Sequence, residues 1–135
     1  MNVLTLDVET THKTKVSGGT TALPYFNNRL VSIGYKWLGE NEVSYDFVYH
    51  SDERASVGED WFANMQATLD KTDVLVGQNL KFDLTWVRAC GFKYDGHVYD
   101  TMVAEYILAK AKRWSLSLDS LAKRYGVTQK EKDLV

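Results

Sequence analysis

Two carboxylates stand one residue apart at the end of an apolar run in VLTLDVETTHK, residues 3–13. Because side chains alternate across a β-strand, Asp7 and Glu9 project from the same face. Like charges at this spacing repel each other, and burial strengthens the repulsion. A divalent cation would offset it, so the pair predicts a metal site. Two solvated acids at a strand end are the alternative that the pair alone leaves open.

A second group of polar residues follows a later apolar run, in GQNLKFD at 77–83. Asn79 offers an amide at the turn, and Asp83 lies in the first turns of the helix predicted to follow. The two are four residues apart and share a helix face if that helix begins early. Helix capping explains Asn79 alone and the helix dipole explains Asp83 alone. Their joint occurrence after a strand that can lie beside the first one favours a site.

Two further acids, in YDTMVAEYILAK, are assigned structural positions. Asp100 is placed to cap a helix. Glu105 lies on that amphipathic helix, whose apolar face consists of Met102, Val103, Tyr106 and Ile107. The sequence has no Cys/His spacing of a zinc site, no glycine-rich phosphate loop and no GxSxG motif. The chemistry therefore rests on oxygen ligands, which suit Mg²⁺ or Mn²⁺.

The composition is that of one ordinary globular domain of 135 residues, 44% hydrophobic and 25% charged. Neither a membrane span nor a signal pattern occurs, so we expect no membrane partner. The single cysteine, Cys90, excludes an internal disulfide and fits the cytoplasm. Residues 110–135 carry seven Lys/Arg against three Asp/Glu. The rest of the chain is acidic, so the basic segment could bind phosphates while the acidic part binds cations. A solvated helix face explains the basic residues equally well.

The elements that must position these acids follow from hydrophobic periodicity and turn residues. The order of elements predicts an α/β domain with a mixed sheet, in which three antiparallel strands come first and a parallel strand is added after a crossover helix. Residues 11–28 are predicted to be a long loop. Strands are predicted over 3–9, 29–38, 42–50 and 73–79, and helices over 58–71, 80–91, 100–114 and 117–126.

Four segments of the chain, taken in order, resemble the DEDD 3′–5′ exonuclease superfamily. They are LDVET, GQNLKFDLTWV, YDTMVAEYILAK and SLDSLAKRYG. The resemblance is strongest to the proofreading domain of phage-type family A DNA polymerases. The first motif of that family is a D-x-E at a strand end, matched by Asp7 and Glu9. The second is N-x-x-x-(F/Y)-D, matched by Asn79, Phe82 and Asp83. The similarity covers nearly the whole chain and implies a ribonuclease H-like fold.

The resemblance implies hydrolysis of the terminal phosphodiester at a DNA 3′ end, which releases a nucleoside 5′-monophosphate. Two divalent cations, Mg²⁺ or Mn²⁺, are implied as cofactors. Carried over by position, Asp7 bridges both metals, Glu9 binds the metal that holds the nucleophilic water, and Asp83 supports the second metal through water. Two cations about 4 Å apart can activate water, clamp the phosphate and stabilise the leaving oxygen together.

The resemblance also implies the partners. The 3′ end of single-stranded DNA is the substrate, and Thr10, Thr11 and Asn79 are the residues expected to contact its terminal nucleotide. A polymerase domain is expected in the same or a neighbouring polypeptide. The expected location is cytoplasmic, and it is the host cytoplasm if the gene belongs to a phage.

One part of the family pattern is missing. The third catalytic motif, Y-x-x-x-D or H-x-x-x-D, lies beyond the SLDSLAKRYG helix, and the chain reaches Val135 without it. Asp119 is a helix cap in a segment that already has its family counterpart, and Asp133 has no Tyr or His four residues before it. We therefore expect residues 1–135 to be one exonuclease-like domain, incomplete at the C-terminus, with weak or no activity alone. A carboxylate borrowed from another chain, or an inactive remnant that still binds single-stranded DNA, are the alternatives.

A binding module without chemistry is the competing class of function on the same fold. A nucleic-acid backbone could be contacted by the basic residues Lys110, Lys112 and Arg113, and the neighbouring Trp114 could stack on a base. Simple packing of Trp114 explains the same residues equally well. Binding that weakens steeply with salt but ignores Mg²⁺ is the property that would distinguish this class.

Overall fold

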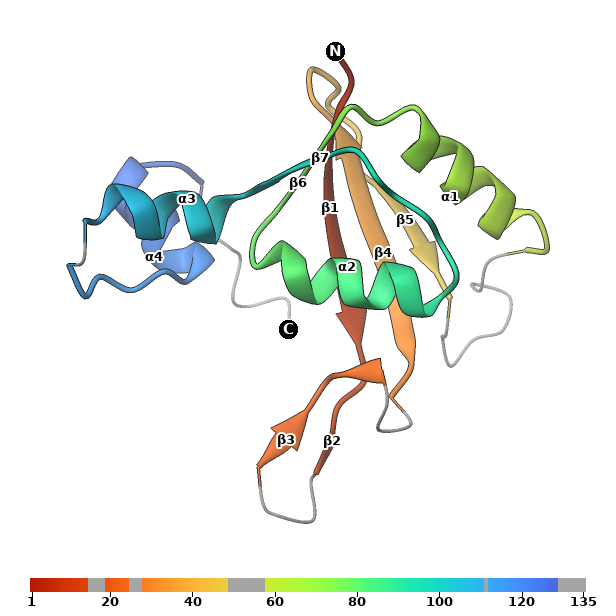
Figure 1. Ribbon diagram of the computed structural model, residues 1–135, viewed down its shortest axis with the longest axis horizontal. Helices are drawn as coiled ribbons and strands as arrows, with labels where there is room; N and C mark the ends of the chain where they lie inside the picture. The colour runs from red at the N-terminus through yellow and green to blue at the C-terminus, as the bar shows by residue number, and fades with distance from the viewer. Residues whose placement is uncertain (15–18, 25–27, 49–57, 111, 129–135) are drawn as a thin grey trace.

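The computed structural model describes residues 1–14, 19–24, 28–48, 58–110 and 112–128. The predicted strands and helices occur in the predicted order along the chain, and three short strands are added to them (Figure 1). The strands are β1 (Val3–Thr10), β2 (Lys13–Thr14), β3 (Thr20–Thr21), β4 (Leu30–Trp37), β5 (Ser44–Phe47), β6 (Val74–Gly77) and β7 (His97–Asp100). The helices are α1 (Trp61–Asp70), α2 (Leu80–Ala89), α3 (Thr101–Leu108) and α4 (Leu118–Tyr125).

Five of the strands form one mixed sheet in the order β5-β4-β1-β6-β7. β1 pairs antiparallel with β4, which pairs antiparallel with β5. On its other edge β1 pairs parallel with β6, which pairs parallel with β7. The antiparallel trio, followed by a parallel strand after the crossover helix α1, confirms the predicted fold class. It is consistent with a ribonuclease H-like exonuclease fold.

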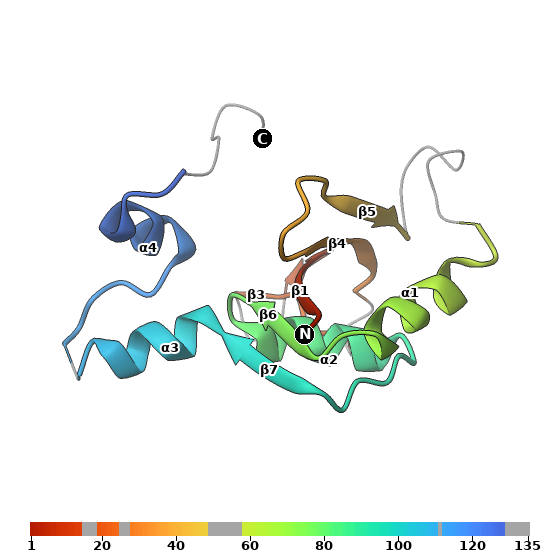
Figure 2. The same ribbon diagram turned by 90° about the horizontal axis from the view of Figure 1, so that it is seen from above.

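The hydrophobic core lies on one face of β1. Leu4, Leu6 and Val8 are buried, whereas the alternate residues Asp7 and Glu9 are exposed. Helices α1 and α2 cover the buried face, and Figure 2 shows them on the same side of the sheet. Their contributions to the core are Met65 and Leu69 from α1 and Leu80, Trp86 and Val87 from α2. The strand alternation thus separates a packed face from a face that carries the acids.

The junction between β6 and α2 requires a glycine and a shared acid. A Cβ on Gly77 would lie 2.6 Å from Leu80 Cδ1 and 3.2 Å from the carbonyl oxygen of Leu6, so a larger residue requires Leu80 to move and crowds the β1 backbone. The Asp100 carboxylate accepts hydrogen bonds from the backbone N–H of Asn79 (3.0 Å), of Leu80 (2.7 Å) and of Met102 (2.9 Å). Asp100 therefore caps α3 as predicted, and it also holds the first turn of α2.

The structure differs from the predicted elements in three places. A short β2–β3 hairpin lies within the predicted loop, and β7 was not predicted. The helix predicted over 100–114 ends at Leu108, because Lys110 has a left-handed φ of 48°, which stops a helix. Residues 49 and 50 of the predicted second hairpin strand lie outside the described part of the chain.

The predicted apolar face of α3 is wrong. Val103, Tyr106 and Ile107 are 50%, 64% and 67% exposed, whereas Glu105 is only 3% exposed. The reason is that α3 packs on α4 through a polar contact, in which Arg124 and Tyr125 both bind the Glu105 carboxylate. Helical periodicity identifies which apolar residues share one face of a helix, but it does not identify the element against which that helix packs.

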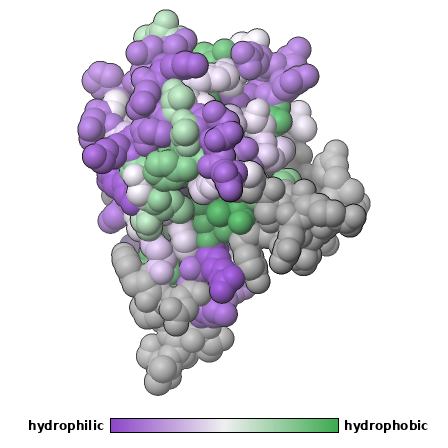
Figure 3. Space-filling view, turned by 90° about the vertical axis from the view of Figure 1, so that its right-hand side faces the viewer, coloured by the Kyte–Doolittle hydropathy of each residue, from purple (hydrophilic) through white to green (hydrophobic). Residues whose placement is uncertain are grey.

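The surface on the side of α1 and β5 is largely hydrophilic, with a narrow apolar area between the charged groups (Figure 3). Among the helices in the described ranges, none has the length and apolar character needed to cross a membrane.

Candidate metal centre

Asp7 and Glu9 lie near the C-terminal end of β1, on the face opposite the core. The antiparallel register places Asp7 opposite Gly34 and Glu9 opposite Ser32, and it shifts between Glu9 and Thr10. Both carboxylates therefore come from the part of β1 that is fixed by β4, whereas the pairing with β6 covers only residues 3–5. This geometry follows the spacing that the sequence shows.

Asp83 reaches the same strand from α2. Its side chain is 2% exposed, and its Oδ1 accepts a hydrogen bond from the backbone N–H of Val8, at 2.9 Å. Val8 lies between Asp7 and Glu9, so the third acid is anchored at the middle of the pair. Burial, together with a smaller effect of the Asp7 charge, raises the pKa of Asp83 to about 7, against the opposing effect of the Val8 hydrogen bond.

The chemistry of these donors fits a hard divalent cation, because all three are carboxylates. The effect of Asp7 on the pKa of Asp83 is a repulsion between two acids that a cation would relieve. Across the described ranges, however, no three His, Cys, Asp or Glu side chains stand close enough to hold one metal ion as a group. Asp7 and Glu9 on β1 and Asp83 on α2 lie at the same segment of β1, but they do not surround one common metal position.

A cleft of about 670 Å³ separates the end of β1 from α4, and we call it the β1–α4 cleft. Asp7 and Glu9 line one side, and Leu118, Leu121 and Tyr125 are among the residues of the other. The cleft thus combines Asp7 and Glu9 on one side with a mainly apolar wall that carries a third acid, Asp119.

Hydrogen bonds from the end of β6 hold α4 across this cleft. Gln78 Nε2 donates to the carbonyl oxygen of Leu116, two residues before the helix, at 2.7 Å. The Thr101 hydroxyl contacts the side-chain carbonyl of Gln78 and lies 3.2 Å from the carbonyl oxygen of Gly77. Ser117 caps α4, since its Oγ accepts from the backbone N–H of Ser120 at 3.2 Å.

The predicted substrate contacts lie near the acids but not in the cleft. The Thr11 hydroxyl donates to Asn28 Oδ1 at 3.1 Å and accepts from the backbone N–H of Arg29 at 2.8 Å, so it ties the strand end to β4. Thr10 is partly buried at the register shift. Asn79 is exposed and precedes α2 with a left-handed φ of 56°. None of the three belongs to the described lining of the β1–α4 cleft.

Sequence reasoning missed three residues around the acids. Thr101 and Tyr125 line the β1–α4 cleft, and Gly34 faces Asp7 across the sheet. A Cβ on Gly34 would lie 3.0 Å from Tyr45 Cε1, so this position is already crowded. The glycine within a strand that otherwise carries β-branched and aromatic residues was a usable signal, since strand glycines often mark a close approach. Nothing local to Tyr125 indicated which helix face it occupies.

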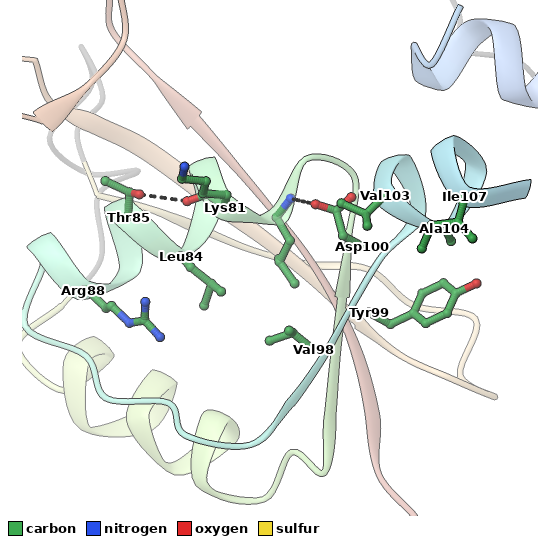
Figure 4. A pocket seen from close by; sticks show the side chains of 11 residues that line it. Lys81, Leu84, Thr85, Arg88, Val98, Tyr99, Asp100, Val103, Ala104 and Ile107 are labelled. Carbon is green, nitrogen blue, oxygen red and sulfur yellow. Dashed lines mark hydrogen bonds between the residues drawn. The ribbon is translucent and has the colours of Figure 1, made fainter. Parts of the chain in front are cut away.

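A second groove, of about 580 Å³, lies between α2 and α3 over β7 (Figure 4). Leu84, Val98 and Ile107 are among its apolar residues, and Arg88 stands at one end in the view. Its carboxylate, Asp100, points to the start of α2, where it is used in capping. None of the predicted site residues lines this groove, so the acids and the more apolar hollow are separate features.

Comparison with known proteins gives a family. Residues 1–135 match the model of the 3′–5′ exonuclease domain of DNA polymerase family A, and the chain therefore belongs to this family. No curated protein sequence matches it. The predicted resemblance to a DEDD exonuclease of a polymerase is confirmed.

A solved structure gives the same fold. The family B DNA polymerase from the hyperthermophilic archaeon Pyrobaculum calidifontis aligns with a TM-score of 0.55 at 16% sequence identity. The alignment covers 95% of this chain and 18% of the polymerase chain. The chain thus spans less than a fifth of that protein, and the likeness at this identity concerns the fold.

Proposed function

We propose that the chain is a two-metal-ion 3′–5′ exonuclease domain that removes the 3′-terminal nucleotide of single-stranded DNA as a nucleoside 5′-monophosphate. The observation that carries the proposal is the position of Asp83, whose carboxylate is anchored on the backbone of Val8 between Asp7 and Glu9. The family supports a nuclease. Residues 1–135 act in this proposal as a single exonuclease-like domain beside a polymerase domain, in the same or a neighbouring polypeptide.

In this proposal Asp7, Glu9 and Asp83 hold two Mg²⁺ or Mn²⁺ ions. Bound ions supply an activated water and stabilise the charge that develops on the phosphate and the leaving oxygen. Pairing of β1 with β4 fixes the backbone of the first two acids, and the Val8 N–H fixes the orientation of the third. The raised pKa of Asp83 shows that its ionised form is disfavoured in the fold, and a nearby positive charge would stabilise that form.

Thr10, Thr11 and Asn79 remain proposed contacts of the terminal nucleotide. The Thr11 hydroxyl is already bonded to Asn28 and Arg29, so its support of the nucleotide is indirect and acts through the shape of the strand end. The exposed side chain of Asn79 stands at the start of α2, one turn before Asp83. It can meet a sugar or phosphate that extends beyond the acids.

Residues 1–135 contain no Y-x-x-x-D or H-x-x-x-D, the third catalytic motif of the resembled superfamily. A missing ligand weakens metal binding and disturbs the geometry on which metal catalysis depends. We therefore expect slow or undetectable cleavage by this chain alone. Metal binding, measured directly, is then the first test of the site.

The experiment measures Mn²⁺ binding and the shortening of a single-stranded oligonucleotide at its 3′ end. Asp7→Asn and Glu9→Gln should weaken Mn²⁺ binding and abolish any cleavage. Glu40→Gln is the matched control, because Glu40 is an exposed acid in the turn after β4. If Asp7→Asn binds Mn²⁺ as Glu40→Gln does, the proposed site is wrong. Rapid cleavage by the wild-type chain, abolished in Asp7→Asn, would contradict only the expectation of weak activity.

A binding module without chemistry is the second candidate. The excess of basic residues over 110–135 favours it, since the remainder of the chain is acidic. Binding of single-stranded DNA that weakens with salt, with no Mn²⁺ bound at Asp7 and no cleavage, would favour this candidate over the nuclease.

A further inference from the structure

Glu105 and Asp83 are the charged side chains buried in the described part of the chain, and Glu105 has no part in the proposed metal site. Its Oε1 forms a salt bridge with Arg124 Nη2 at 3.0 Å, and its Oε2 accepts a hydrogen bond from the Tyr125 hydroxyl at 2.6 Å. Burial of a carboxylate costs free energy unless it is paired and hydrogen-bonded, and here both conditions hold. Glu105 therefore fixes two neighbouring side chains of α4.

The first ring that Glu105 fixes is exposed beside the acids. Tyr125 is 59% exposed and lines the β1–α4 cleft with Asp7 and Glu9. The hydrogen bond to Glu105 raises the pKa of the Tyr125 hydroxyl above its ordinary value of 10.0. The polar end of the side chain is thus tied to the protein, and the ring remains accessible at the cleft.

The second ring is held through Arg124. The Arg124 guanidinium donates to the carbonyl oxygen of Ser115 at 3.0 Å, and its Cζ lies 5.3 Å from the ring centroid of Trp114. Lys112 Nζ lies 4.9 Å from the same centroid. Trp114 is 44% exposed. A cation near an aromatic ring restrains it, so a second accessible ring is positioned from the same buried carboxylate.

The surroundings of Trp114 are positively charged, whereas Tyr125 shares its cleft with Asp7, Glu9 and Asp119. Lys112 and Arg113 directly precede Trp114 in the sequence, and Lys123 precedes Arg124 on α4. Proteins that bind single strands without sequence preference combine a basic surface with aromatic rings on which successive bases stack. The apolar residues of the cleft wall, such as Leu118 and Leu121, offer no hydrogen bonds that would distinguish one base from another.

We propose that Tyr125 and Trp114, both held by the Glu105–Arg124 pair, form a stacking platform for the bases of a single-stranded nucleic acid whose 3′ end lies at Asp7 and Glu9. The proposal rests on the proposed function for the position of that end. Tyr125 stacks the base nearest the acids, and Trp114 stacks a base further along the strand. Glu105 is a positioning residue, and it touches neither the strand nor a metal.

The test measures the affinity of the full chain for fluorescein-labelled oligothymidylate by anisotropy, in EDTA so that no cleavage occurs. Tyr125→Leu and Tyr125→Phe form a matched pair, because both lose the hydrogen bond to Glu105 and only the phenylalanine keeps a ring. Trp114→Leu and Trp114→Phe form the second pair. Each leucine variant should raise the Kd roughly 5- to 150-fold relative to its phenylalanine partner, the range for loss of one stacked base.

Two further readouts separate a platform from a merely structural role. Binding of the oligonucleotide should quench the tryptophan fluorescence of the wild type, and most of that quenching should be absent in Trp114→Phe. Lys112→Ala should reduce the slope of log Kd against log salt by about 0.7, the value for one neutralised phosphate on a single strand. Tyr106→Leu is the control, since Tyr106 is an equally exposed tyrosine on α3.

The proposal is overturned if the wild type does not bind the oligonucleotide, if the leucine and phenylalanine partners bind equally, or if Tyr106→Leu weakens binding as much as Tyr125→Leu. These results are independent of the nuclease test. Aromatic-dependent binding without metal or cleavage would leave the platform and refute the exonuclease. Metal binding at Asp7 with no aromatic dependence would leave the exonuclease and refute the platform.

Discussion

Replacement of Asp83 by asparagine tests the electrostatics of the site without a substrate. Asparagine has nearly the same shape, and its side-chain carbonyl can still accept the hydrogen bond from the Val8 N–H. The variant removes only the ability to ionise. Because the native pKa of Asp83 is raised from 3.8 to about 7, the native chain holds its proton more tightly than the unfolded chain does.

The sign and size of the effect follow from this difference. Below pH 3.8 the carboxyl is protonated in both states and contributes no pH dependence. As the pH rises towards 7, the unfolded chain loses the proton first, so the free energy of unfolding of the wild type falls. A shift of about three pKa units corresponds to roughly 4 kcal/mol. Asp83→Asn should therefore gain up to about 4 kcal/mol over the wild type between pH 4 and pH 8, and no more above that.

The assay is urea denaturation of both chains across this pH range in EDTA, which excludes metal ions. The quantity of interest is the difference in unfolding free energy between variant and wild type, so pH effects of other groups cancel. A difference that is constant from pH 4 to pH 8 would refute the argument. Added Mg²⁺ should stabilise the wild type above pH 7 more than it stabilises Asp83→Asn, because the variant keeps Asp7 and Glu9 but lacks the third carboxylate.

Three further predictions concern the framework of the site. Gly77→Ala should lower the free energy of unfolding by about 1–3 kcal/mol, because its Cβ would meet Leu80 and the Leu6 backbone; urea denaturation checks this, and an unchanged midpoint would contradict it. Gly34→Val should lower the free energy of Mn²⁺ binding by more than it lowers the free energy of unfolding, since its side chain crowds the position opposite Asp7. A Mn²⁺ titration that matches that of the wild type would rule this out. Gln78→Ala should cost about 1 kcal/mol and speed proteolysis before α4, because the bond to the Leu116 carbonyl is lost; an unaltered digestion rate would count against it.

The sheet was predictable from the sequence because its signals are local. The alternation of Leu4, Leu6 and Val8 with Asp7 and Glu9 sets the two faces of β1 before any neighbour is known. The crossover helix between the antiparallel strands and β6 then fixes the parallel pairing. Asp100 was predictable as a cap for the same reason, since capping depends on residues within one turn.

The residues that were missed depend on packing between distant segments. The two turns of α3 present both Glu105 and Tyr106, and only the position of α4 decides which is buried. β7 is short and carries few buried residues, so its pattern is weak until β6 is beside it. The hydroxyl of Thr11 was predicted to meet a nucleotide, but it is satisfied within the fold by residues 28 and 29.

The two buried carboxylates are stabilised in opposite ways, and the contrast indicates their roles. Glu105 has a cation and a hydroxyl donor within hydrogen-bond distance, so its charge is balanced by the protein itself. Asp83 accepts from the backbone of Val8, but it forms no salt bridge with any residue in the described ranges, and the charge of Asp7 acts against it. A buried acid that lacks a cation and faces another acid lowers the stability of the fold at neutral pH. Such a cost is typical of functional positions, and a divalent cation at Asp7 and Glu9 would remove it.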